Sequence, residues 1–296
     1  MDRYLQTFID SYTGYARYLY REIAIPSWHN YFYWLIGISL FFFTLEWFFS
    51  WRKDQPKIRQ DFWLDGFYMF FNFFLFSLIG YNAISSVFVQ AFNELLASVG
   101  ITNMAAIRIG SWPIWSQLLT LFVLRDFIHW NVHRLLHRVP FLWEFHKVHH
   151  SVKQMGFAAH LRYHWMENIV YRMIEYIPLG MIGFGIQDFF FVHIIALSIG
   201  HFNHSNIRVS LGPLRYLFNN PQMHTWHHAK TWPAQYKYGV NFGISLSLWD
   251  YLFGTVHMTT DLKDIELGFP GDETFPRSFT KQLTYGIKKK LPDSPI

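Results

Sequence analysis

The feature that most limits the fold is a run of apolar side chains from Tyr31 to Trp51, which holds a single formal charge, Glu46. A run of this length is long enough for a helix to cross the hydrocarbon core of a bilayer. Residues 63–89 form a second such run and residues 113–130 a third. Because lipid cannot pair with backbone polar groups, such segments fold as helices. The sequence therefore predicts an all-α, integral membrane protein.

Composition agrees with burial in lipid rather than in water. Aromatic residues make up 21% of the 296 positions and charged residues only 15%, against roughly 25% charged residues in an average soluble domain. The formal charge of +5 is a modest excess, and its Lys and Arg residues cluster beside the apolar runs. This placement is typical of membrane topology signals and does not favour nucleic-acid binding.

Basic residues orient the expected spans. Arg52, Lys53, Lys57 and Arg59 directly follow the first apolar run, and the positive-inside rule places such a loop in the cytosol. The second run then leads outward, and the third returns to the cytosolic side near His129.

A less regular apolar stretch covers residues 168–200 and is interrupted by Pro178, Gly180, Gly183 and Gly185. Because Pro and Gly weaken helices, we expect two short helices that enter the bilayer and return as a hairpin. The predicted fold is thus a helical bundle of about four spans, the last pair being this hairpin, with a cytosolic helical cap.

The chain divides into four expected parts. Residues 1–30 carry aromatic side chains at helical spacing, which predicts an interfacial amphipathic helix or, equally, an ordinary surface helix. Residues 31–125 hold the transmembrane helices, residues 126–257 form a catalytic domain that includes the hairpin, and residues 258–296 form a cytosolic tail.

The chain has no cysteine, so disulfides, thiolate zinc sites and iron–sulfur clusters are excluded. Any protein-bound metal must be held by His, Asp, Glu or water. Of the 16 histidines, 14 lie between His129 and His228, so their distribution already indicates one functional region.

Three histidine clusters stand out in this region. Histidines spaced three or four residues apart lie on one face of a helix, so the rings of a cluster can converge on one point. Eight neutral imidazoles are too many for one tetrahedral zinc ion and suit two metal ions of intermediate softness with open positions for water or oxygen. The eight are His133, His137, His146, His149, His150, His224, His227 and His228.

Two other classes of protein compete with a redox enzyme. A membrane zinc-dependent hydrolase would need an activated water and a nearby base, but the clusters contain no H-E-x-x-H motif. A transporter or other non-catalytic metal-binding membrane protein would hold its ligands near the membrane midplane, whereas these clusters lie at the ends of the expected spans. One H-x-x-x-H match would be weak evidence, but three clusters together favour a metal site.

The motifs resemble the fatty acid hydroxylase / sterol desaturase superfamily of integral membrane, histidine-ligated di-iron enzymes. The resemblance covers about residues 126–257. It rests on the segments Asp126-Phe-Ile-His-Trp-Asn-Val-His133-Arg-Leu-Leu-His137, Leu142-Trp-Glu-Phe-His146-Lys-Val-His149-His150, Met223-His224-Thr-Trp-His227-His228, Asn241-Phe-Gly243 and Leu248-Trp-Asp-Tyr-Leu-Phe-Gly-Thr255.

The resemblance implies further ligands besides the eight clustered histidines. His204 matches the family pattern best, His201 lies one helical turn earlier, and His164 falls in a family-like segment before the hairpin. His160 is expected beside the ligands. Ligating imidazoles usually donate their second N–H to an acceptor, and Asp126, Asp250 and Asn241 are expected as such supporting residues, although each Asp would equally suit a helix cap or a salt bridge.

The resemblance also implies the reaction. Two iron ions and O2 would hydroxylate or desaturate a lipid, which could be a sterol, a fatty acyl chain, a sphingoid base, or an ether or amino lipid. The active site would face the cytosol at a bacterial inner membrane or the endoplasmic reticulum. No G-x-G-x-x-G turn is present, so an external electron donor is implied: a b-type cytochrome or ferredoxin with its reductase, or a reduced pterin.

Overall fold

The computed structural model describes residues 2–100, 109–184, 186–259 and 265–287. The predicted all-α class is confirmed for these residues, whose extended pairing is limited to three isolated bridges. The α-helices are α1 (Asp2–Ala24), α2 (Tyr31–Phe49), α3 (Phe62–Phe70), α4 (Asn82–Ser98), α5 (Ile114–Arg138), α6 (Pro140–His150), α7 (Trp165–Ile182), α8 (Ile186–His204), α9 (Pro221–His227), α10 (Leu248–Leu252) and α11 (Phe279–Leu283).

Two helices are long and apolar enough to cross a membrane. One is α2, and the other is the helical stretch from Phe62 to Ser98, in which α3 and α4 are joined through two π-helical turns, Phe71–Leu75 and Ser77–Tyr81. Gly80 bends this long helix, since its φ of 137° is a conformation that side-chain-bearing residues rarely adopt. The other expected spans fall short of the same length and hydropathy criterion among the described residues, so the span count stays a prediction.

The expected hairpin consists of α7 and α8. Gly183 ends α7 with a φ of 102°, the left-handed conformation usual at helix ends. The predicted interruption at Pro178 is wrong, because α7 continues through it to Ile182. Membrane helices tolerate such a proline because neighbouring groups satisfy the freed carbonyl. Gly185 lies outside the described residues.

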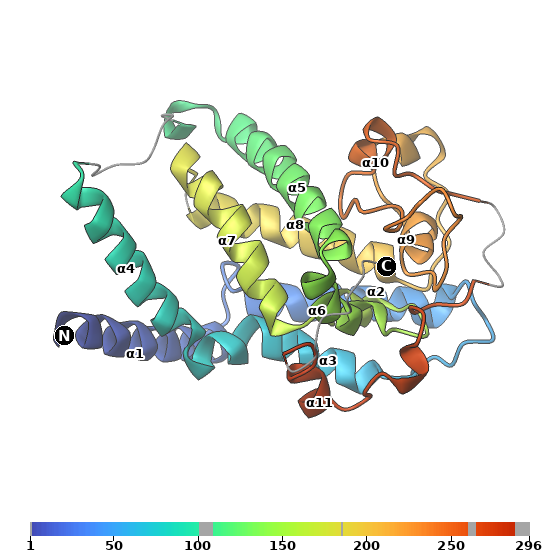
Figure 1. Ribbon diagram of the computed structural model, residues 1–296, viewed down its shortest axis with the longest axis horizontal. Coiled ribbons are helices and arrows are strands. Elements are labelled where there is room, and N and C mark those ends of the chain that lie inside the picture. Colours follow the sequence, from blue (N-terminus) through green and yellow to red (C-terminus); the bar gives the residue numbers. More distant parts are fainter. Residues whose placement is uncertain (1, 101–108, 185, 260–264, 288–296) are drawn as a thin grey trace.

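The N-terminal segment is helical, as expected, and pairs with α4. The Tyr4 hydroxyl donates a hydrogen bond of 2.7 Å to the Glu94 carboxylate, and Arg3 forms an ion pair of 2.8 Å with the same carboxylate. Apolar side chains such as Leu5 and Ile9 remain exposed. In Figure 1, α1 and α4 lie at one end of the molecule, while α9 and α10 lie at the other.

The apolar core joins the spans to the histidine-bearing helices. Leu35 and Phe42 of α2 pack with Met69 of α3, with Leu197 of α8, and with Phe157 in a 3₁₀ turn that follows α6. Helix α6 begins at Pro140, a position where the missing N–H costs nothing, and it folds back beside the end of α5 (Figure 1).

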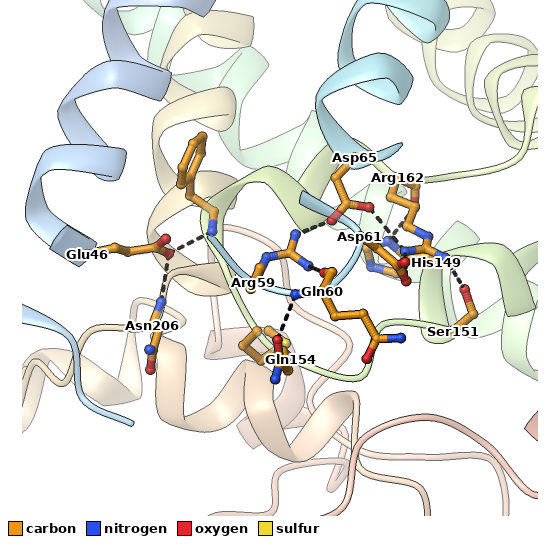
Figure 2. Close-up of polar contacts among 12 residues, drawn as sticks. Glu46, Arg59, Gln60, Asp61, Asp65, His149, Ser151, Gln154, Arg162 and Asn206 are labelled. Carbon is orange, nitrogen blue, oxygen red and sulfur yellow. Dashed lines mark hydrogen bonds and ion pairs between the residues drawn. The ribbon is translucent and has the colours of Figure 1, made fainter. Parts of the chain in front are cut away.

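A buried charge network ties the basic loop after α2 to the segment after α6 (Figure 2). Asp65 of α3 is fully buried and pairs with the guanidinium groups of Arg59 and Arg162, the latter at 3.2 Å. Arg162 also contacts Asp61 at 3.1 Å and donates to Ser151 over 2.9 Å. Arg59 is therefore buried, and its charge is neutralised inside the protein.

Glu46, the lone charge of the first span, completes the connection. Its carboxylate accepts backbone N–H groups from Phe157 at 2.7 Å and Asn206 at 2.8 Å. One side chain of α2 thereby holds both the turn after α6 and the residues that directly follow α8 (Figure 2).

Replacing Asp65 by Ala is expected to leave two arginines buried without their shared counter-charge. Loss of one partner of a buried pair costs about 3–5 kcal/mol, so the variant should unfold at a clearly lower temperature in detergent. The exposed Asp54 provides the control: Asp54→Ala should unfold like the wild type. Equal unfolding temperatures for Asp65→Ala and Asp54→Ala would show that the network does not stabilise the fold.

Candidate metal centre

The eight clustered histidines come together at one buried point. His133 and His137 lie in the last two turns of α5, and His146, His149 and His150 end α6. His224 and His227 lie in α9, and His228 directly follows it. His204, the last residue of α8, joins them. All nine side chains are buried.

The nine imidazoles form two groups. Within each group, one nitrogen from every ring lies within 4.8 Å of the others. The first group, named here the five-histidine group, comprises His133, His137, His146, His150 and His227. The four-histidine group comprises His149, His204, His224 and His228. The groups are adjacent, because the ring centroids of His150 and His228 are 4.6 Å apart.

Distances within the four-histidine group suit a shared cation. The Nε2 atom of His224 lies 2.9 Å from that of His204 and 3.2 Å from that of His228. A divalent ion such as zinc binds imidazole nitrogen at about 2.0–2.1 Å, which places neighbouring ligand nitrogens roughly 3–3.4 Å apart. The observed spacing therefore matches a common coordination centre.

In five of the nine rings, the Nδ1 atom has a hydrogen-bond acceptor outside the groups. Nδ1 of His133 lies 2.8 Å from the Phe242 carbonyl, and Nδ1 of His227 lies 2.8 Å from the Val240 carbonyl. Similar contacts join His149 to the Arg162 carbonyl at 3.0 Å, His204 to the Gly200 carbonyl at 2.8 Å, and His146 to the Glu167 carboxylate at 2.8 Å. Donation of Nδ1–H to these acceptors directs the Nε2 lone pairs inward.

Several inward-facing nitrogens have no hydrogen-bond partner. In the five-histidine group these include Nε2 of His137, His146 and His227. A buried polar atom without a partner is costly, and several at one point need a common explanation. A bound metal ion would satisfy them together, so the residues present fit a metal centre with two positions.

Burial keeps these imidazoles neutral. Desolvation lowers the pKa of His149 to about 4 and that of His227 to about 3, from 6.5 for a free side chain. Desolvation is also the main reason why the pKa values of four more rings are lowered well below 6.5; these rings are His146, His150, His224 and His228. Neutral imidazole is the form that binds metal.

Comparison with known proteins agrees with this geometry. Residues 118–255 match the fatty acid hydroxylase family. The chain carries a fatty acid hydroxylase domain. This domain contains all nine grouped histidines, so the resemblance to the superfamily expected from the motifs is confirmed.

Curated relatives of the fatty acid hydroxylase domain act on lipids, by their names. An ornithine lipid hydroxylase of Rhizobium tropici is 30% identical over 60% of this chain and 53% of its own length. Alkylglycerol monooxygenases are 30% identical in Caenorhabditis elegans and 32% identical in Xenopus tropicalis, each over 48% of this chain and 27% and 30% of their own lengths. The matches thus span about half of the first relative and under a third of the others. No solved structure matches.

The carboxylates of Asp126 and Asp250 contact loop N–H groups rather than the imidazoles. Asp126 accepts from the backbone N–H groups of Ser245 and Leu246, at 3.0 and 3.1 Å, and from the Trp249 indole at 2.9 Å. Asp250 accepts from Phe242 and Gly243 in the same way. Both carboxylates therefore hold the loop that follows residue 239, and it is carbonyls of this loop that receive the imidazole N–H groups.

Asn241 lies between the two carbonyl acceptors, Val240 and Phe242, in a left-handed conformation with φ of 53°. Its side-chain amide donates to the Met223 carbonyl at 2.8 Å and the His257 carbonyl at 2.6 Å. The expected supporting role therefore takes the form of fastening this loop to α9.

Three other expected histidines lie outside both groups. His164 caps α7: its Nδ1 accepts from the Met166 N–H at 3.1 Å, and its Nε2 lies 2.9 Å from the Leu283 carbonyl. With both nitrogens engaged, this ring has no lone pair for a metal. His201 likewise contacts Ser39 through Nε2 at 3.1 Å and His160 through Nδ1 at 3.0 Å. His160 lies next to the four-histidine group: the centroid of its ring is 5.2 Å from that of the His204 ring.

Sequence reasoning did not assign the acceptors for the ligand rings. Glu167 forms a capping box with His164 in the structure, but the sequence signature of this motif begins with Ser or Thr, so the segment gave no signal. The carbonyl acceptors of Arg162, Gly200, Val240 and Phe242 gave none, because every residue has a carbonyl group.

Acidification is expected to destabilise the metal-free protein. Since the folded pKa values of His149 and His227 lie below 6.5, the unfolded chain binds more protons than the folded chain between these values, and stability falls as pH falls through this window. Thermal unfolding in detergent at about pH 7 and about pH 5 measures the loss. The double variant His149→Ala/His227→Ala should lose less thermal stability between the two pH values. An equal loss would show that these two histidines do not cause the pH dependence.

Proposed function

We propose that this protein is a membrane-bound di-iron oxidoreductase that uses O2 to oxidise a lipid C–H bond. The observation that carries the proposal is the pair of adjacent histidine groups whose inward nitrogens lack partners. The names of the relatives, a lipid hydroxylase and lipid monooxygenases, favour hydroxylation over desaturation.

Iron suits this donor set better than zinc does. Structural zinc sites are closed by four ligands, whereas this centre offers nine imidazoles in two groups. A pair of iron ions supplies redox chemistry with dioxygen, which zinc lacks. Hydroxylation balances when O2, two electrons from an external donor and two protons convert C–H into C–OH and release water.

A cavity of about 150 Å³ beside the two groups is the proposed place of the substrate. It reaches His133 and His146 of the five-histidine group and His149 and His204 of the four-histidine group. Leu161 and Leu197 contribute apolar surface to the same wall. The role of the protein here is to orient the reacting carbon and to exclude bulk water.

The proposed topology is multi-pass, with the metal centre on the cytosolic face. It is supported by the basic loop after α2, which lies at the histidine-bearing end. Backbone contacts join Trp51 to Asn206 at 2.8 Å, two residues after His204, and the Gln55 side chain donates to the Met155 carbonyl at 2.7 Å. An external donor, a b-type cytochrome or ferredoxin system or a reduced pterin, would approach from this side.

Removing one histidine from each group tests the metal centre. His149→Ala and His227→Ala should each lower bound iron by at least half and abolish lipid oxidation, because each removes a ligand from a different position. The exposed His29 gives the matched control: His29→Ala should keep both properties. Metal analysis of the purified proteins decides, and full iron binding in either cluster variant would remove that residue from the ligand set.

Comparing lipids of cells with and without the gene tests the reaction. A lipid heavier by one oxygen atom is expected, and one lighter by two hydrogens would indicate desaturation instead. Zinc in place of iron, together with hydrolytic activity, would favour the hydrolase alternative. Stably bound metal without any lipid change would favour a non-catalytic metal-binding protein.

A further inference from the structure

Helix α1 carries a row of apolar side chains that the rest of the described protein leaves uncovered. This row, named here the apolar stripe, consists of Leu5, Ile9, Tyr12, Tyr20 and Ile23, and Leu5 and Tyr20 are 59% and 69% exposed. At 3.6 residues per turn, the five positions fall within about 80° of the helix circumference. One exposed apolar residue is ordinary, but a continuous apolar surface of this kind marks a contact surface.

A row of polar side chains runs along the same helix beside the apolar stripe. This polar stripe consists of Arg3, Gln6, Asp10, Arg17 and Arg21, all of which are exposed. Its members lie within about 60° of one another on the helix circumference. Gln6 donates a hydrogen bond of 2.9 Å to Asp10. Arg17 and Arg21 form no ion pair with any residue that the structure describes, so two cations of the stripe are open to an outside partner.

The third face of α1 packs against the protein and fixes the direction of both stripes. Thr7 donates to Gln90 of α4, and Leu19 is buried in the apolar core. The Tyr15 hydroxyl donates a hydrogen bond of 3.2 Å to the Phe73 carbonyl. Phe73 lines the cavity beside the histidine groups, so α1 supports part of the cavity wall. In Figure 1, α1 lies at the margin of the molecule beside α4, away from the histidine-bearing helices.

The end of α1 is fastened to the start of the membrane helix α2. The Glu22 carboxylate accepts a hydrogen bond of 3.0 Å from the backbone N–H of Phe32, and the Asn30 side chain donates one of 3.0 Å to the Glu22 carbonyl. Trp28 in the connection is 83% exposed. Since α2 also exposes apolar side chains such as Phe41, the apolar stripe continues a surface suited to lipid, and it is not free to turn inward.

The three faces suit the boundary between lipid and water. In bulk water, the apolar stripe would lose the free energy gained by burial. A second copy of the chain would cover the stripe, but it would not explain the aromatic residues Tyr12, Tyr20 and Trp28, because rings with one polar end are typical of membrane–water boundaries. Lipid phosphates also provide the counter-charge for Arg17 and Arg21.

We propose that α1 lies in the plane of the membrane, at the boundary between acyl chains and headgroups. Its apolar stripe contacts the acyl chains, and Arg17 and Arg21 contact anionic headgroup phosphates. Helices of this kind bury their apolar face about 5–10 Å into the boundary. The inference goes beyond the proposed reaction and rests only on the proposed membrane attachment. It gives α1 the role of holding the cavity wall at Phe73 at a fixed depth.

Single labels on the full-length protein test this position, because the chain has no cysteine of its own. Two pairs of neighbours are matched controls for each other: Leu5→Cys with Gln6→Cys, and Ile9→Cys with Asp10→Cys. Each carries one fluorophore in vesicles of phosphatidylcholine and phosphatidylglycerol. Lipid brominated at its upper acyl carbons should quench the Leu5 and Ile9 labels at least about threefold more than their neighbours, since an apolar face lies inside the boundary. Acrylamide in the water should show the reverse order.

A label on α2 separates this inference from the membrane attachment itself. Phe41→Cys should be quenched by lipid brominated deep in the acyl chain. If it is, while all four α1 labels respond to acrylamide alone, α1 is an ordinary surface helix and the inference fails with the attachment intact. Acrylamide quenching at Phe41 as well would overturn both. Leu5 and Ile9 labels shielded from both quenchers would show that protein covers the stripe, which also contradicts the inference.

Removing the two free cations tests the contact with phosphates. In the Ile9-labelled protein, Arg17→Gln/Arg21→Gln should reduce quenching by brominated lipid in vesicles that contain phosphatidylglycerol and leave it unchanged in pure phosphatidylcholine, because basic residues are attracted to anionic surfaces. Lys53→Gln, an exposed cation in the loop after α2, is the control and should change neither value. Equal quenching in the double variant and the control would overturn the phosphate contact.

Discussion

Neutral imidazole nitrogens buried without protein partners are the constraint on which the rest of the structure depends. Nine rings from four helices meet where water is excluded, and charged imidazolium groups at such spacing would repel one another. Folding therefore has to place neutral rings with their lone pairs inward, which is favourable only if a cation completes the site. The elements that surround the cluster hold those rings in this orientation.

Backbone carbonyls, rather than carboxylates, do most of the orienting. In the loop after residue 239, the Phe242 carbonyl accepts a hydrogen bond from His133 of α5. The Val240 carbonyl accepts one from His227 of α9. Asp126 and Asp250 keep that loop in place by accepting its N–H groups. Carboxylates held one step away from the rings fix geometry without adding negative charge to the ligand shell, so the centre stays less anionic than one built from Asp and Glu ligands.

The N-terminal helices contribute to the site through charge as well as through hydrophobic packing. Asp65 and Glu46 belong to the two helices most suited to span a membrane, and both reach the segment between Phe157 and Arg162. The Arg162 carbonyl, in turn, accepts from the ligand-candidate His149 (Figure 2). Through Arg162, the helix that carries Asp65 is thus linked to a ring of the four-histidine group, and the same helices provide part of the wall of the adjacent cavity.

The sequence by itself determined the helical class, the apolar runs typical of membrane helices and the eight clustered histidines, because these follow from local spacing and composition. Its motifs also carry the resemblance to the fatty acid hydroxylase family. Histidines three and four residues apart must share a helix face wherever that helix lies. Only the tertiary structure decided which rings belong to which group, and that His204 joins them while His164 and His201 do not. It also showed that Asp126 and Asp250 accept from loop N–H groups, and that Arg125 and Glu175 form an ion pair. These facts depend on which helices pack together and on carbonyl acceptors that every residue possesses, and neither leaves a local pattern in the chain.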